Sequence, residues 1–239
     1  MKFRSVGKIL SALIFTISLS TMMIFISLAE FTSYSNLKPV MTKVIASSFS
    51  DSLSQQISTI ERYCKNREKL EIVVGEKNFT INCSTFKKET ILDEISSEYF
   101  DQIYFKEYEC EFIDCFRLNT TENFMILISK KGNELYIQAR NWCMVVAILS
   151  GLFLFLSTKN WEERFKVFGS SFIFIGLPLF TLKYLSSQII SFFNIKTEEM
   201  INLVQHLFSP LNLYYKVFLS VGVVLLGIGY CISYYRKKH

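Results

Sequence analysis

Residues 9–28 read ILSALIFTISLSTMMIFISL, twenty consecutive positions without a charged side chain. A helix of this length rises about 30 Å at 1.5 Å per residue, which matches the hydrocarbon core of a bilayer. Three further segments are apolar enough to cross a membrane, and we expect these spans near residues 135–158, 167–190 and 213–235. The sequence therefore predicts a multi-pass α-helical membrane protein with four spans.

The composition agrees with this class. Half of the 239 residues are hydrophobic and 23 of them are Phe, which is more apolar surface than a soluble domain of this length usually carries. The net charge of +5 does not indicate a nucleic-acid partner. Residues 30–141 hold 17 acidic and 14 basic residues, so the positive excess lies beside the spans. The residue patterns call for no cofactor.

Basic residues mark one side of the predicted bundle. They occur before the first span, between the second and third spans, and after the fourth span. They are Lys2, Arg4, Lys8, Lys159, Arg164, Lys166, Arg236, Lys237 and Lys238. Short loops rich in Lys and Arg face the cytoplasm. The pattern predicts a cell-membrane protein with both termini in the cytoplasm and residues 30–141 outside.

The chain then divides into three parts. Residues 1–29 form a signal-anchor span, residues 30–141 an extracytoplasmic domain, and residues 142–239 a membrane domain with an outer amphipathic helix at 197–208. Ser27-Leu28-Ala29 is an acceptable signal-peptide cleavage site, but the apolar core before it is longer than the usual 7–15 residues. This length favours an uncleaved anchor, and either outcome leaves residues 30–141 outside.

The domain at 30–141 shows both helical and strand periodicity. Apolar residues recur every three or four positions in two stretches and alternate or cluster in four short ones. The expected helices run from about Asn36 to Cys64 and from Lys88 to Tyr104, and the expected strands are 70–74, 79–83, 107–112 and 124–129. Gly75 is the expected turn of a hairpin. We therefore expect a small α+β domain between spans 1 and 2, with disulfide bonds across it.

Four of the six cysteines lie in this domain: Cys64, Cys83, Cys110 and Cys115. An even count on an oxidising side of the membrane predicts two disulfides. Three pairings are possible, and we favour Cys64–Cys83 with Cys110–Cys115. Zinc binding is the alternative, although the domain has no histidine and no Cys-x-x-Cys pair.

Three Asn-x-Ser/Thr triplets, at Asn78, Asn82 and Asn119, make the domain a candidate glycoprotein. Asn119 is the best acceptor because it lies in a polar loop. Asn78 and Asn82 lie in or beside an expected strand, where we expect crowding to keep one of them unmodified.

Acidic residues alternate along one expected strand. Glu107, Glu109 and Glu111, here called the acidic run, share a face, and Asp114 follows closely. Clustered carboxylates suit a metal such as calcium, and an exposed acidic face suits a basic partner. Alternate strand positions lie nearly 7 Å apart, however, so an ordinary solvated face is the simplest interpretation.

The sequence indicates the function of the protein less clearly than it indicates the fold. The sequence has no phosphate-binding loop, no metalloprotease motif and only two histidines, which leans against an enzyme. We expect a membrane-anchored binding, structural or accessory-subunit protein, which would contact the lipid bilayer and another membrane protein or a second copy. Two alternatives stay open. Pro178 and Lys183 in the third span suit a transporter or channel component, and the acidic residues suit a metal-dependent enzyme of the outer domain.

Overall fold

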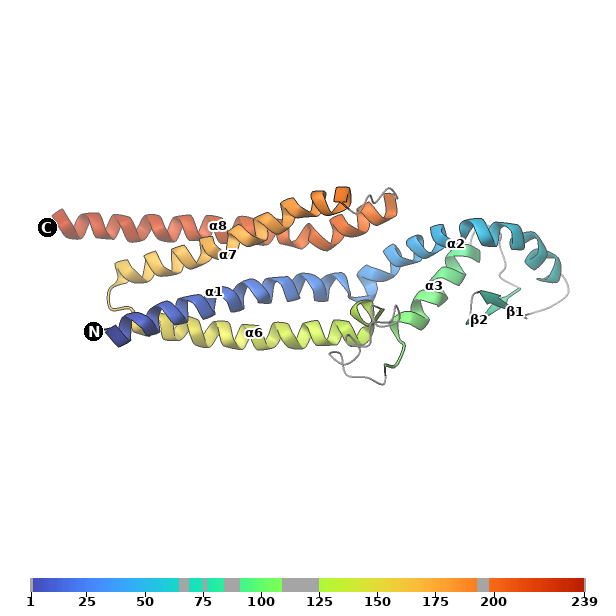
Figure 1. Cartoon of the computed structure of the whole chain (residues 1–239), viewed down its shortest axis with the longest axis horizontal. Helices are drawn as coiled ribbons and strands as arrows, with labels where there is room; N and C mark the ends of the chain where they lie inside the picture. The colour runs from blue at the N-terminus through green and yellow to red at the C-terminus, as the bar shows by residue number, and fades with distance from the viewer. Residues whose placement is uncertain are drawn as a thin grey trace. The chain divides into compact units, whose positions relative to one another are not determined.

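The computed structural model in Figure 1 describes residues 2–64, 69–74, 77–83, 91–108, 125–192 and 198–238. The chain divides into two compact units. The membrane unit comprises residues 1–31 and 134–239, and the polar unit comprises residues 32–133. Each unit has buried hydrophobic residues of its own.

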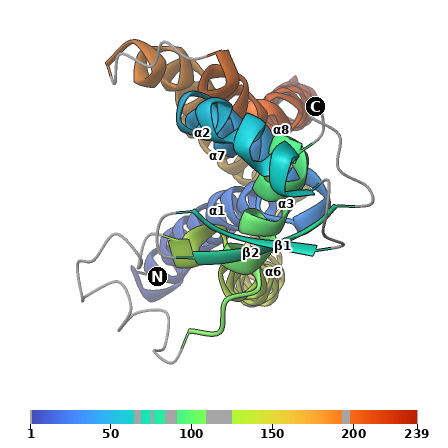
Figure 2. The ribbon, with the colours of Figure 1, turned by 90° about the vertical axis from the view of Figure 1, so that its right-hand side faces the viewer.

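Four long helices make up the membrane unit. They are α1 (Lys2–Phe31), α6 (Lys130–Ser157), α7 (Trp161–Phe192) and α8 (Glu198–Lys238). Each contains a stretch long and apolar enough to cross a membrane, namely Val6–Phe31, Lys130–Ser157, Trp161–Thr181 and Leu211–Lys238. Figure 1 shows the four running along a common direction, and Figure 2 shows them end-on.

The outward surfaces of these helices are apolar. On α6, for example, Leu149 is 62% exposed and Leu156 is 71% exposed. Large apolar side chains left in water cost about 25 cal/mol for each Å², and contiguous patches of this kind mark contact with lipid or protein. The chain therefore has the character of a membrane protein with four candidate spans, as the hydropathy predicted.

Helices α7 and α8 pack most closely, and glycines make the approach possible. A Cβ placed on Gly169 would lie 2.8 Å from the backbone N of Leu226 and 2.9 Å from the carbonyl O of Gly222. A Cβ on Gly222 would in turn lie 2.9 Å from the carbonyl O of Gly169. Small residues let membrane helices approach backbone to backbone, where dispersion contacts hold them together.

Aromatic side chains connect α1 to this pair. The ring of Phe15 meets those of Phe168 and Phe172 edge-on, with centroids 5.6 and 6.1 Å apart. Phe15 also lies against Gly151 of α6. Farther along the bundle, residues of α7 and α8 form a buried cluster, which consists of Ile175, Leu179, Leu211 and Phe218.

The polar unit is built on two helices that pack together, α2 (Tyr34–Cys64) and α3 (Ile91–Tyr104). Apolar residues at helical spacing bury one face of each, including Leu37 and Ile45 of α2 and Ile95, Phe100 and Ile103 of α3. Strands β1 (Lys69–Val74) and β2 (Lys77–Asn82) form an antiparallel hairpin in which Ile72 pairs with Phe79.

The expected α+β class is wrong, because the chain is almost entirely helical. Among the described residues the one sheet is this two-stranded hairpin, which is too small to form a layer of the core. Residues 106–108 have no regular structure, and 109–112 lie outside the described residues. The segment expected as a strand at 124–129 instead contains a 3-10 helix, η1 (Ile126–Ile128), that leads into α6.

Capping explains this difference. The Ser129 hydroxyl donates to the carbonyl O of Ile126 (2.8 Å) and accepts from the backbone N–H of Gly132 (3.3 Å). A serine that bonds the N–H three residues ahead starts a helix. A Cβ on Gly132 would collide with the carbonyl O of Ile126. Gly132 therefore permits a close approach of the chain at the start of α6.

Helix α8 also differs from expectation. The outer helix expected at 197–208 is not separate, because residues 198–208 are the first turns of the continuous helix Glu198–Lys238, which runs through Pro210. Proline interrupts one backbone hydrogen bond and often kinks a helix. It does not end α8, and Pro178 likewise lies inside α7.

Candidate functional site

Two hydrogen bonds hold together the chain segments that lead from the polar unit to the spans. Thr32 directly follows α1, and Asn133 lies in the first turn of α6. The Asn133 side-chain N–H donates to Thr32 Oγ1 (2.9 Å), and the Tyr104 hydroxyl donates to the Thr32 carbonyl O (3.1 Å). Thr32 is only 2% exposed and Tyr104 only 4%. Through Thr32, the segment after α1 and the first turn of α6 are thus hydrogen-bonded to each other and to α3.

A charged network lies beside this point. The Tyr34 hydroxyl donates to Asp101 Oδ1 (2.9 Å), and the Lys38 ammonium donates to Asp101 Oδ2 (2.8 Å) and to the Tyr34 oxygen (2.6 Å). Lys38 follows Tyr34 by one helical turn, so both reach α3 from one face of α2. We call Thr32, Tyr34, Lys38, Asp101, Tyr104 and Asn133 the junction cluster.

Aromatic rings fill the space around the network. The ring of Tyr34 lies 5.3 Å from those of Tyr104 and Phe105 and 6.1 Å from that of fully buried Phe100. Such ring pairs stabilise by about 0.5–1.5 kcal/mol beyond their buried area. The rings and hydrogen bonds together fix the start of α2 against the end of α3.

Within the junction cluster, the Lys38 ammonium and the Asp101 carboxylate neutralise each other as an ion pair. Hydrogen bonds from Lys38 to Asp101 and Tyr34 raise the pKa of Lys38, because they favour its charged form. Both carboxylate oxygens of Asp101 accept hydrogen bonds within the cluster. The junction cluster is therefore suited to holding α2 against α3. It offers no nucleophile beside a base.

The acidic run is described at one position. Glu107 is exposed, next to Lys106 and Tyr108, whereas Glu109, Glu111 and Asp114 lie outside the described residues. Within the described part of the chain, no three His, Cys, Asp or Glu side chains come together as metal ligands. The metal and partner-binding interpretations of this run stay predictions.

The expected Cys64–Cys83 disulfide is present. It connects the end of α2 to the residue after β2, and Cys143 and Cys231 are free thiols. Cys110, Cys115 and Asn119 lie outside the described residues. Asn78 and Asn82 belong to β2, where they pair with Val73 and Lys69, so their glycosylation stays a prediction.

The expected basic segments lie at one end of the membrane unit. Figure 1 places there the start of α1, the link between α6 and α7, and the end of α8. Lys8 pairs with Glu163, and Lys166 with Glu162 (2.7 Å). The Arg164 guanidinium lies 4.0 Å from the ring centre of Phe155. These contacts tie the ends of α1, α6 and α7 together.

Sequence reasoning missed the junction cluster. Tyr34 and Asp101 are 67 positions apart, and no local pattern connects them. The spacing of Tyr34 and Lys38 was the available signal, and it shows only that they share a helical face. The chain matches no protein-family model, no curated protein and no solved structure.

Proposed function

We propose that this chain is a membrane-anchored binding or accessory subunit, which presents the polar unit to another membrane protein on the non-cytoplasmic side. The junction cluster is the observation that carries the proposal. Through Thr32 it hydrogen-bonds the two ends of the polar unit to each other and to α3. A domain whose helices are packed in this way presents a preorganised surface to a partner, which lowers the entropy cost of association.

Two other features support the placement of the polar unit. The Cys64–Cys83 bridge is typical of oxidising compartments. The gathering of the basic segments at one end of the membrane unit suits a cytoplasmic face. Protease protection on intact cells tests this topology. External cleavage in the 109–124 segment, with the 158–160 link protected, is expected, and the opposite result would contradict it.

Purification from native membranes in mild detergent tests the binding role. We expect a membrane protein to elute with the chain at fixed stoichiometry. Asp101→Asn should weaken this association, because it removes the charge that pairs with Lys38. Glu98→Gln is the matched control, since Glu98 is an exposed acid on the same helix. A chain that elutes alone, and that conducts ions or moves solute in liposomes, would replace this role with transport.

A further inference from the structure

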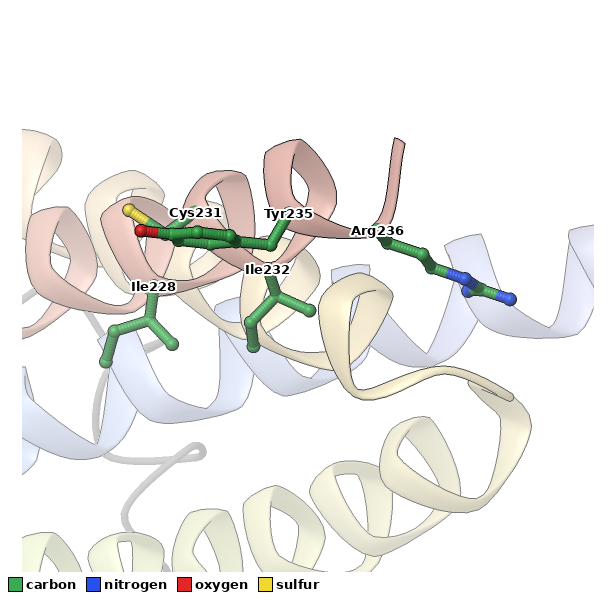
Figure 3. A pocket seen from close by; sticks show the side chains of 5 residues that line it. All are labelled: Ile228, Cys231, Ile232, Tyr235 and Arg236. Atoms are coloured by element: carbon green, nitrogen blue, oxygen red, sulfur yellow. The ribbon is translucent and has the colours of Figure 1, made fainter. Parts of the chain in front are cut away.

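An open groove runs along the last turns of α8. It has a volume of about 710 Å³ and is lined by Ile228, Cys231, Ile232, Tyr235 and Arg236. Figure 3 shows Ile228 and Ile232 projecting to one side, Cys231 and Tyr235 lying together, and Arg236 extending toward the helix end. The lining is almost entirely apolar, so Arg236 contributes its aliphatic stem, and its guanidinium extends beyond the groove.

On an α8 that crosses the membrane, the groove would lie at the depth at which acyl chains meet headgroups. Ile228 and Arg236 are eight residues apart, which is about 12 Å along the helix. Tyr230, Tyr234 and Tyr235 are 64–66% exposed around this segment, and exposed tyrosines of spanning helices concentrate at the membrane interface. In that position the apolar part of the groove would face the hydrocarbon, and Arg236 would reach the level of the phosphates.

The charge at this end is positive. Glu162 lies within electrostatic range of Arg236, but its carboxylate pairs with the Lys166 ammonium. The end of α8 carries about half a negative charge from its helix dipole, which Arg236, Lys237 and Lys238 in the last turn exceed. A guanidinium also binds phosphate oxygens in a bidentate manner.

From this combination we propose that the α8 groove is a binding site for an anionic phospholipid. One acyl chain lies along Ile228, Cys231 and Ile232, and the headgroup phosphate bonds to Arg236. A zwitterionic lipid fits less well, because its own cation meets the positive end of α8. The site requires that α8 crosses the membrane, and it is independent of the partner-binding role of the polar unit.

Native mass spectrometry of the full chain in detergent tests the site, with dioleoyl phosphatidylglycerol and dioleoyl phosphatidylcholine as probes. The wild type should retain the anionic lipid preferentially. Arg236→Gln should reduce that retention about tenfold or more, as expected for losing a charge-assisted hydrogen bond. The matched variant Lys237→Gln removes a charge outside the groove lining, and its loss should not exceed about fivefold.

A second pair of variants tests the apolar seat without changing charge. Cys231→Trp fills the groove and should lower retention of the anionic lipid, whereas Val223→Trp replaces a 62% exposed residue outside the lining and should not. Equal retention of the two lipids by the wild type would overturn the proposal, because the groove would then contact lipid without selecting an anionic headgroup. Equal effects within either pair of variants would also overturn the proposal, because binding would then not depend on the groove.

Discussion

Gly169→Ala should weaken the packing of α7 on α8. The new methyl group would meet backbone atoms of Leu226 and Gly222 at 2.8–2.9 Å, well inside normal contact distance. Backbone atoms cannot turn aside as a side chain can, so the helices must separate. Overpacking of this kind costs about 1–3 kcal/mol, and separation also loses dispersion contacts along the pair.

Gly227→Ala is the matched control, because a Cβ there has no atom within 4 Å. Both changes replace glycine inside a helix, so both gain the same helix propensity of about 1 kcal/mol and the gain cancels in the comparison. Gly169→Ala should therefore be less stable than Gly227→Ala by about 1–3 kcal/mol. Unfolding in mixed micelles of mild detergent and dodecyl sulfate, followed by circular dichroism, measures the difference.

Gly176→Ala provides a finer test of the same reasoning. Its Cβ would lie 2.7–2.9 Å from side-chain carbons of Leu219, and 3.2 Å from the Leu219 backbone N. The leucine side chain can rotate, so the loss should be smaller than for Gly169→Ala. A Gly169→Ala variant within about 0.5 kcal/mol of the control, the usual range for exposed sites, would refute backbone-to-backbone packing. A larger loss at Gly176 than at Gly169 would refute the ranking.

Three further outcomes concern the polar unit. Reduction of Cys64–Cys83, which are 19 positions apart, should destabilise the unit by about 3 kcal/mol, and unchanged protease resistance after reduction would contradict this. The pKa of Lys38 is raised in the folded protein, so its stabilising effect is complete below the ordinary lysine pKa of about 10.4 and is lost as pH rises through the higher folded value. The melting temperature should therefore fall at alkaline pH. Asp101→Asn should abolish this fall, and Glu98→Gln should not. Changing the acidic run to Gln should leave folding within about 0.5 kcal/mol and weaken a basic partner in a salt-dependent way, whereas unchanged association would leave the run a solvated surface.

The spans and the basic ends could be predicted because their signals are local. Twenty apolar residues in succession identify a spanning helix without knowledge of its neighbours. The hairpin at β1 and β2 is also local, since Gly75 separates two short apolar runs. The Cys64–Cys83 pairing was favoured among three possible pairings, between which the sequence alone could not decide.

The rest depended on contacts between distant residues. The junction cluster joins Thr32 to Tyr104 and Asn133, which lie 72 and 101 positions away. The α+β class failed for a related reason. An apolar run such as 124–129 fits a strand or a buried helical turn equally well, and the Ser129 cap and the close approach of Gly132 to Ile126 decide between them.

The two units respond to different conditions, and this bears on the proposed role. The contact of α7 and α8 rests on glycine backbone and apolar side chains, which neither reductant nor pH alters. The polar unit is stabilised by the Cys64–Cys83 disulfide, which a reductant breaks, and by the Lys38–Asp101 pair, which alkaline pH weakens. The proposed binding role therefore predicts that reductant or alkaline pH weakens partner association while the membrane helices stay packed.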